Sequence, residues 1–122
     1  MSRGPNPETI LQNTILAEFG ARKSMMNVEI FHMYVGAVWN QAAHCYQKTG
    51  PHHPRGMSDI VILATGGRTY FIEVKLPGEK QNPDQVSFQR NVERLGFTYD
   101  IAHSGHEGLE ILRKYKILKD AI

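Results

Sequence analysis

The sequence predicts one α/β domain, residues 1–122, whose elements run in the order helix, strand, hairpin, helix, strand, helix. A chain of 122 residues with 41% hydrophobic content is long enough for one core and too short for two ordinary ones. Two strand-like runs flank a glycine-containing turn. The triplet Asn-Pro-acid occurs twice, each time before a helical stretch.

The first helix is expected over residues 7–19, just after Asn6. In its Asn-Pro-acid start, the asparagine can cap the helix, the proline needs no N–H bond, and the acid favours the helix dipole. Residues 27–35 mix β-branched and aromatic side chains and predict a strand, although the pattern also fits a helix as far as Ala43. Residues 47–56 contain two Gly and two Pro and predict a loop.

An antiparallel hairpin is predicted from residues 58–64 and 68–76. We favour a three-residue turn, 65–67, over a two-residue turn, because Gly67 readily takes the left-handed conformation that such a turn needs at its end. The hairpin is followed by a predicted helix, strand and helix over 83–95, 97–102 and the stretch after Ser104, where Ser104 and Glu107 form a capping-box pattern. The apolar residues expected to pack from these helices are Val86, Phe88, Val92, Leu95, Leu109, Leu112, Tyr115 and Ile117.

The hairpin carries charged residues within mostly apolar runs. A three-residue turn places Asp59 opposite Glu73, whereas a two-residue turn places it opposite Val74. Two opposed carboxylates repel each other unless a cation lies between them, and all-oxygen ligation suits Mg²⁺ or Mn²⁺. Lys75 shares the face of Glu73 and could stabilise a phosphate or help to deprotonate water. A solvated Glu-x-Lys pair on an exposed sheet is the simpler alternative.

The order Gly56, Ser58-Asp59 and Glu73-Val74-Lys75 resembles the PD-(D/E)xK nuclease motif. Within that superfamily the chain is similar to the virus-type replication-repair nuclease family, VRR-NUC, over residues 7–112. The other residues that carry the resemblance are Glu8, Gln85 and Gly96-Phe97. Ser58 departs from the pattern, because it stands where the superfamily motif has proline.

The resemblance implies a restriction-endonuclease-like core, a mixed sheet of about four strands flanked by helices. It implies that Asp59, Glu73 and the Val74 carbonyl bind Mg²⁺ or Mn²⁺, with Glu8 contributing directly or through water. Catalysis is then assigned to Lys75, Glu73, Asp59, Glu8 and Gln85. Glu8 also has an ordinary explanation as a first-turn acid, and Gln85 as an N-terminal helix residue.

Contacts with DNA are expected from Ser58, Arg55, His53 and Arg90. His52 is also expected to touch phosphates or water from the loop. Further candidates for the DNA backbone, although each is better explained as a solvated helix charge, are Arg22, Lys23, Arg94, Arg113, Lys114 and Lys116. The pairs His44-Cys45 and His52-His53 would supply zinc ligands, but adjacent pairs lack the usual ligand spacing.

We therefore expect a metal-dependent DNA endonuclease that cuts branched DNA, such as a four-way junction or flap. Its expected role is replication or repair of a phage type. It is expected to act as a homodimer or higher homo-oligomer. A sequence-specific or nonspecific nuclease or nickase, and a non-catalytic DNA-binding module of the same fold, are the alternatives. The net charge of +2 permits a nucleic-acid partner without requiring one. Cytoplasmic location, in a phage host or bacterium, is expected because no signal peptide or membrane span is recognisable and Cys45 is the only cysteine.

Overall fold

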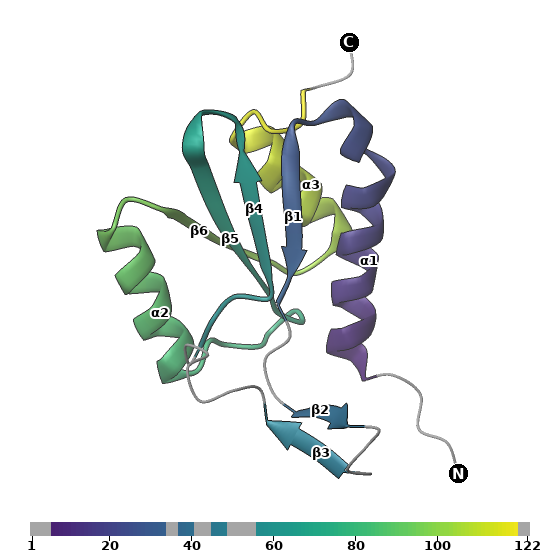
Figure 1. The fold of residues 1–122 in the computed structure, drawn as a ribbon, viewed down its shortest axis with the longest axis vertical. Helices are drawn as coiled ribbons and strands as arrows, with labels where there is room; N and C mark the ends of the chain where they lie inside the picture. Colours follow the sequence, from purple (N-terminus) through teal and green to yellow (C-terminus); the bar gives the residue numbers. More distant parts are fainter. Residues whose placement is uncertain (1–5, 34–36, 41–44, 49–55, 120–122) are drawn as a thin grey trace.

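The computed structural model describes residues 6–33, 37–40, 45–48 and 56–119 (Figure 1). The main predicted elements are all present and in the expected order. They are helices α1 (Pro7–Ala21), α2 (Pro83–Arg94) and α3 (Gly105–Lys114), strands β1 (Val28–His32), β2 (Ala37–Asn40), β3 (Cys45–Lys48), β4 (Ile60–Ala64), β5 (Arg68–Val74) and β6 (Thr98–Ala102), and the 3₁₀ turns η1 (Lys23–Met25) and η2 (Thr65–Gly67). None of the helices described is long and apolar enough to cross a membrane.

Four strands form one mixed sheet in the order β1-β4-β5-β6. β1, β4 and β5 are antiparallel neighbours, whereas β5 and β6 are parallel. The parallel pair needs a crossover connection, and α2 supplies it. This arrangement confirms the predicted α/β fold class, a mixed four-stranded sheet flanked by helices.

A second, two-stranded sheet pairs β2 with β3 and was not predicted. The expected loop over residues 47–56 is wrong at its first two positions, because Gln47 and Lys48 belong to β3. The apolar pattern before Ala43 left strand and helix equally open, and pairing with a second short strand decided the outcome at residues 37–40.

The core lies between the sheet and the pair of helices α1 and α3. Helix α1 contributes Ile15 and Phe19, and α3 contributes Leu112, all fully buried. The two helices approach closely where Gly108 faces Ile15, since a Cβ at Gly108 would lie 3.2 Å from a methyl group of that residue. The sheet residues of this core include Ile60, Ile62, Ile72 and Val74.

Helix α2 lies on the other side of the sheet from α1 (Figure 1) and contacts β6. Phe88 contacts Phe71 of β5 edge to face, with ring centroids 5.6 Å apart, and Phe88 also lies 6.3 Å from the ring of Tyr99. Of the predicted apolar stripe, Val92 is buried, but Leu95 is 63% exposed. Leu95 is the C-cap residue, so it lies beyond the part of the helix that meets the sheet.

The ends of α3 differ from the expectation in two details. Ser104 accepts a hydrogen bond from the Glu107 N–H, as predicted, but the Glu107 carboxylate accepts from the N–H of His103 instead of Ser104. The helix ends at Lys114, so Ile117 packs into the core from beyond it. Lys116 takes a left-handed conformation, with φ of 59°, which breaks the helical path.

The hairpin turn has the predicted three residues, Thr65–Gly67. Gly66 and Gly67 both have positive φ, 80° and 74°, conformations that favour glycine. The ladder pairs Ala64 with Arg68 and runs to Ile60 with Ile72. The next step of the same register sets residue 59 against residue 73.

Candidate active site

Asp59 lies one residue before β4, and both of its carboxylate oxygens are held. Oδ2 accepts a hydrogen bond of 2.7 Å from the backbone N–H of Val74. Oδ1 accepts one of 3.1 Å from Nε2 of Gln12, on α1. The carboxylate is therefore fixed between a helix on one side and strand β5 on the other.

The pKa of Asp59 is raised from 3.8 to about 6. Burial is the largest cause, because it disfavours the charged form, and repulsion from Glu8 and Glu73 adds to it. The hydrogen bond from the Val74 N–H and attraction from Lys75 act in the opposite direction. Asp59 thus lies in an acidic surrounding that a cation would relieve.

Glu73 is 1% exposed, and its two carboxylate oxygens differ in their hydrogen bonds. Oε1 accepts a hydrogen bond from the Tyr99 hydroxyl and another, 3.4 Å long, from Nε2 of Gln81. Burial raises the pKa of Tyr99 far above its ordinary value, so its hydroxyl remains a donor. Oε2 is buried and has no hydrogen-bond partner among the described residues.

Lys75 is 7% exposed, which is unusual for a lysine. It directly follows β5, and its backbone N–H donates to the Ala102 carbonyl of β6 over 3.1 Å, so the chain is anchored at this point. Its positive charge lowers the pKa of Asp59. Burial of both Glu73 and Lys75 excludes the reading of a solvated pair on an exposed sheet face.

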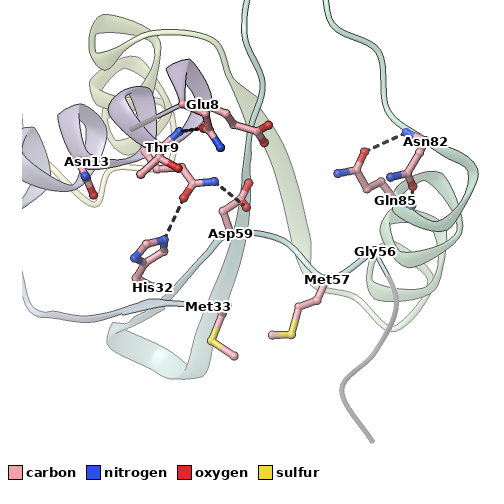
Figure 2. Close-up of a pocket in the computed structure, with 12 residues that line it drawn as sticks. Glu8, Thr9, Asn13, His32, Met33, Gly56, Met57, Asp59, Asn82 and Gln85 are labelled. Carbon is pink, nitrogen blue, oxygen red and sulfur yellow. Dashed lines mark hydrogen bonds between the residues drawn. The ribbon is translucent and has the colours of Figure 1, made fainter. Parts of the chain in front are cut away.

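A polar cleft of about 520 Å³ opens beside Asp59 (Figure 2). Figure 2 shows Glu8 and Asp59 on one side of it and Asn82 and Gln85 across from them. The floor between these sides carries Met33 and Met57. The other lining residues are Asn6, Thr9, Gln12, Asn13, His32 and Gly56.

Several lining residues also belong to helix ends. Gln85 forms a capping box with Asn82, in which each side chain bonds the other residue's backbone N–H over 2.9 Å. The Gln85 side-chain oxygen is therefore engaged at the start of α2. Glu8 lies in the first turn of α1, and it shares the cleft with Asp59 while raising the pKa of that carboxyl.

Gly56 fixes the loop before Asp59 against the start of α2. Its φ is +73°, and a Cβ at this position would lie 2.2 Å from the carbonyl oxygen of Asp84. A contact below 3.0 Å with backbone cannot be relieved by a side-chain rotation. Glycine is thus required here for close packing as well as for conformation.

Ser58 does not present its side chain to solvent. It is 0% exposed, and its hydroxyl donates to the Ile60 carbonyl over 3.2 Å. The hydroxyl is therefore not presented to solvent, and the DNA contact of Ser58 stays a prediction. Ser58 instead supports the turn that leads into β4.

Of the other residues predicted to contact DNA, the structure describes only some. Arg90 is exposed on α2 and does not line the cleft. Arg55 and His53 lie outside the described residues, as do His44 and His52, and the side chain of Cys45 is not described either. The zinc alternative therefore falls outside the described parts of the chain.

Among the residues that the structure describes, only a few oxygen donors lie around Asp59, and these suit a hard divalent cation. Within the described ranges, no three His, Cys, Asp or Glu side chains lie close enough together to hold a metal, so Glu8 does not join Asp59 and Glu73 in a three-carboxylate group. One or two carboxylates suffice for Mg²⁺ when water and substrate oxygens complete its shell. The partnerless Oε2 of Glu73 and the acidic surrounding of Asp59 fit such a cation.

Four residues of the site were not predicted from the sequence: Gln12, His32, Gln81 and Tyr99. Gln12 follows Glu8 by four positions and therefore lies on the same face of α1, a spacing that could have identified it. His32, Gln81 and Tyr99 carry no such local signal. His32 and Tyr99 reach the site through the pairing of β1 with β4 and of β5 with β6. Gln81 reaches it from the segment between β5 and α2, where it bonds Glu73.

No protein-family model matches the chain, and no curated protein matches it either. Among solved structures, the chain is similar to one described as a VRR_NUC domain, with a TM-score of 0.63 and 15% sequence identity. The match covers 91% of this chain and 99% of that structure. The chain therefore has the fold of a VRR_NUC domain, as the motifs predicted.

Proposed function

We propose that this protein is a VRR-NUC nuclease that hydrolyses DNA phosphodiester bonds with Mg²⁺ or Mn²⁺. The observation that carries the proposal is the closeness of Asp59 and Glu73 just beyond the last pair of the β4–β5 ladder, where Glu73 raises the pKa of Asp59, beside the buried Lys75 and in a domain with the VRR_NUC fold. Fold likeness alone does not establish chemistry. The electrostatics of the site supply the argument for it.

In this proposal Asp59, Glu73 and the Val74 carbonyl hold the metal ion. When bound, the ion lowers the pKa of a water molecule and stabilises charge on the phosphate. The chain's own groups prepare the site: the Val74 N–H and the Gln12 amide orient Asp59, and the Tyr99 hydroxyl orients Glu73. Glu8 acts from the far side of Asp59, through water.

Lys75 is the residue that acts on the phosphate. Its ammonium group attracts the negative charge that develops on the phosphate oxygens as the nucleophile attacks. Burial in a low-dielectric surrounding strengthens this attraction. Gln85, across the cleft, positions the substrate through its amide nitrogen, because its oxygen is held in the capping box.

The preferred substrate in this proposal is branched DNA, cut by a homodimer. We infer that the domain reads the shape of DNA more than its sequence. A two-fold dimer would present two sites to two strands of a junction.

The test is a cleavage panel with labelled four-way junctions, flaps and random-sequence duplexes, with Mg²⁺, with Mn²⁺ and with EDTA. We expect cutting of junctions or flaps only with a divalent metal. Asp59→Asn should lose Mn²⁺ binding in calorimetry and cleavage together, because an amide does not replace an anionic ligand. Equal cutting of all duplexes would favour a nonspecific nuclease, and binding without any cutting would favour a non-catalytic module.

A further inference from the structure

Three side chains from different elements form one hydrogen-bonded chain on the wall of the cleft (Figure 2). Nε2 of Gln12 donates to Oδ1 of Asp59 over 3.1 Å. Oε1 of the same amide lies 3.1 Å from Nε2 of His32. Gln12 therefore connects strand β1 to the carboxylate that precedes β4, although the three residues are far apart in the sequence.

The proton positions along this chain are determined by its charged end. An ionised carboxylate accepts hydrogen bonds only, so the Gln12 atom facing Asp59 must be the nitrogen. The oxygen of the amide then faces His32, and His32 must donate through Nε2–H. Each link has one consistent arrangement, and the reverse orientation of the amide would place two acceptors against each other at Asp59.

The Asp59 carboxylate has two anchors because of this chain. The Val74 N–H holds Oδ2, but a single hydrogen bond leaves the carboxylate free to turn about its side-chain bond, whose torsion is broad. The Gln12 amide holds Oδ1 and so fixes the carboxylate plane. The lone pairs of the Asp59 carboxylate that accept no hydrogen bond then point in a fixed direction.

We propose that Gln12 is a positioning residue that orients the Asp59 carboxylate, and that His32 acts through Gln12 by fixing the orientation of its amide. The importance of this orientation for metal binding rests on the proposed function, whereas the orientation itself does not. Groups that orient a ligating carboxylate typically change metal affinity severalfold when removed.

The variants separate these links by chemistry. Gln12→Met keeps the volume and removes both hydrogen bonds. His32→Leu removes the donor to Gln12, and His32→Gln restores an N–H at a similar reach. His106→Leu is the control, because His106 is a largely exposed histidine on α3, away from the cleft. Circular dichroism establishes that each variant is folded, and the two His32 variants decide the question even if Gln12→Met does not fold.

The first measurement uses metal-free protein and does not depend on catalysis. The side-chain amide signals of Gln12 in a ¹H–¹⁵N spectrum are identified by resonance assignment of the wild-type protein. We expect them to move in Asp59→Asn and in His32→Leu, to return toward the wild-type position in His32→Gln, and to stay unchanged in His106→Leu. Gln12 amide signals that do not move in Asp59→Asn, or do not move in His32→Leu, would overturn the proposal.

The second measurement is Mn²⁺ affinity by calorimetry, with cleavage kinetics beside it. We expect Gln12→Met to weaken binding about 10-fold and His32→Leu about 3-fold, with His32→Gln close to wild type. The double variant should be no weaker than Gln12→Met alone, because His32 acts through Gln12. kcat should fall while KM for DNA stays within about twofold. Additive effects of the two substitutions would show that His32 acts by another route and would overturn its assigned role.

The two proposals can fail separately. A wild-type protein that binds no Mn²⁺ and cuts no DNA would overturn the proposed function, and the amide signals of Gln12 would still decide whether it orients Asp59. Strong Mn²⁺ binding that is unaffected by Gln12→Met would retain the metal site and overturn the positioning role.

Discussion

Asp59 makes the stability of the metal-free protein depend on pH. Its pKa is about 6 in the folded chain against 3.8 ordinarily, so the folded state binds the proton more tightly than the unfolded state. Its stabilising contribution is therefore present below about pH 4 and is lost as pH rises through 6. Asp59→Asn is neutral throughout, and its stability relative to wild type should fall by about 2 kcal/mol between pH 8 and pH 4, allowing for partial solvent screening.

Urea denaturation of both proteins without metal, at pH 8, 6 and 4, measures this difference. The other titrating groups are shared by the two proteins, so those that do not interact with Asp59 cancel. A stability difference that is the same at the three pH values would mean that folding does not raise the pKa of Asp59.

Substitutions of Lys75 and of the carboxylates should affect metal binding and turnover differently. If Lys75 acts on the phosphate, Lys75→Ala should remove most cleavage while Mn²⁺ binds equally well or somewhat more tightly, because a neighbouring positive charge has gone. DNA binding should lose about one phosphate contact's share of the salt slope. Robust metal-dependent cleavage by the purified variant would place the chemistry elsewhere.

At the scale of elements, the junction between the loop at Gly56 and the start of α2 is the most demanding contact near the site. Gly56→Ala should destabilise the protein by about 3 kcal/mol or more, because the new methyl group adds a collision with the Asp84 carbonyl to the cost of a left-handed conformation. Gly66→Ala is the matched control: it has a similar φ of +80°, with nothing within 4 Å of its Cβ. It should cost only about 1 kcal/mol.

Thermal and urea unfolding of the two alanine variants measure the comparison. Equal losses would mean that the loop can move away from α2 at little cost. A cleavage defect in Gly56→Ala at a temperature where it is still folded would further indicate that this contact positions the cleft.

The helices, the four strands of the main sheet and the hairpin register could be predicted because their causes are local. Turn chemistry at residues 65–67 sets which residues of β4 and β5 face each other, and the Asn-Pro-acid triplets mark α1 and α2. The contacts of Asp59 with Gln12 and of Glu73 with Tyr99 join distant parts of the chain, so no local pattern contains them. The motif position of Ser58 likewise does not show that its side chain is buried.

At the scale of the whole molecule, oligomeric state remains a prediction. We expect a homodimer in solution or on junction DNA, since paired incisions need two sites. Light scattering at micromolar concentration, alone and with an excess of junction, measures it. A strict monomer in both conditions, together with efficient cutting of junctions, would mean that each strand is cut in a separate encounter.

The contacts of Asp59 also imply an order of events during folding. Its bond to the Val74 N–H closes a separation of 15 residues, whereas its bond to Gln12 spans 47, and Glu73 meets Tyr99 across 26. Short loops close with the smaller loss of chain entropy, so the hairpin brings the carboxylates together before α1 and β6 arrive to hold them. We expect the ability to bind Mn²⁺ tightly to appear late in refolding, after most of the secondary structure has formed. Metal capture would then report that the last long-range contacts are complete.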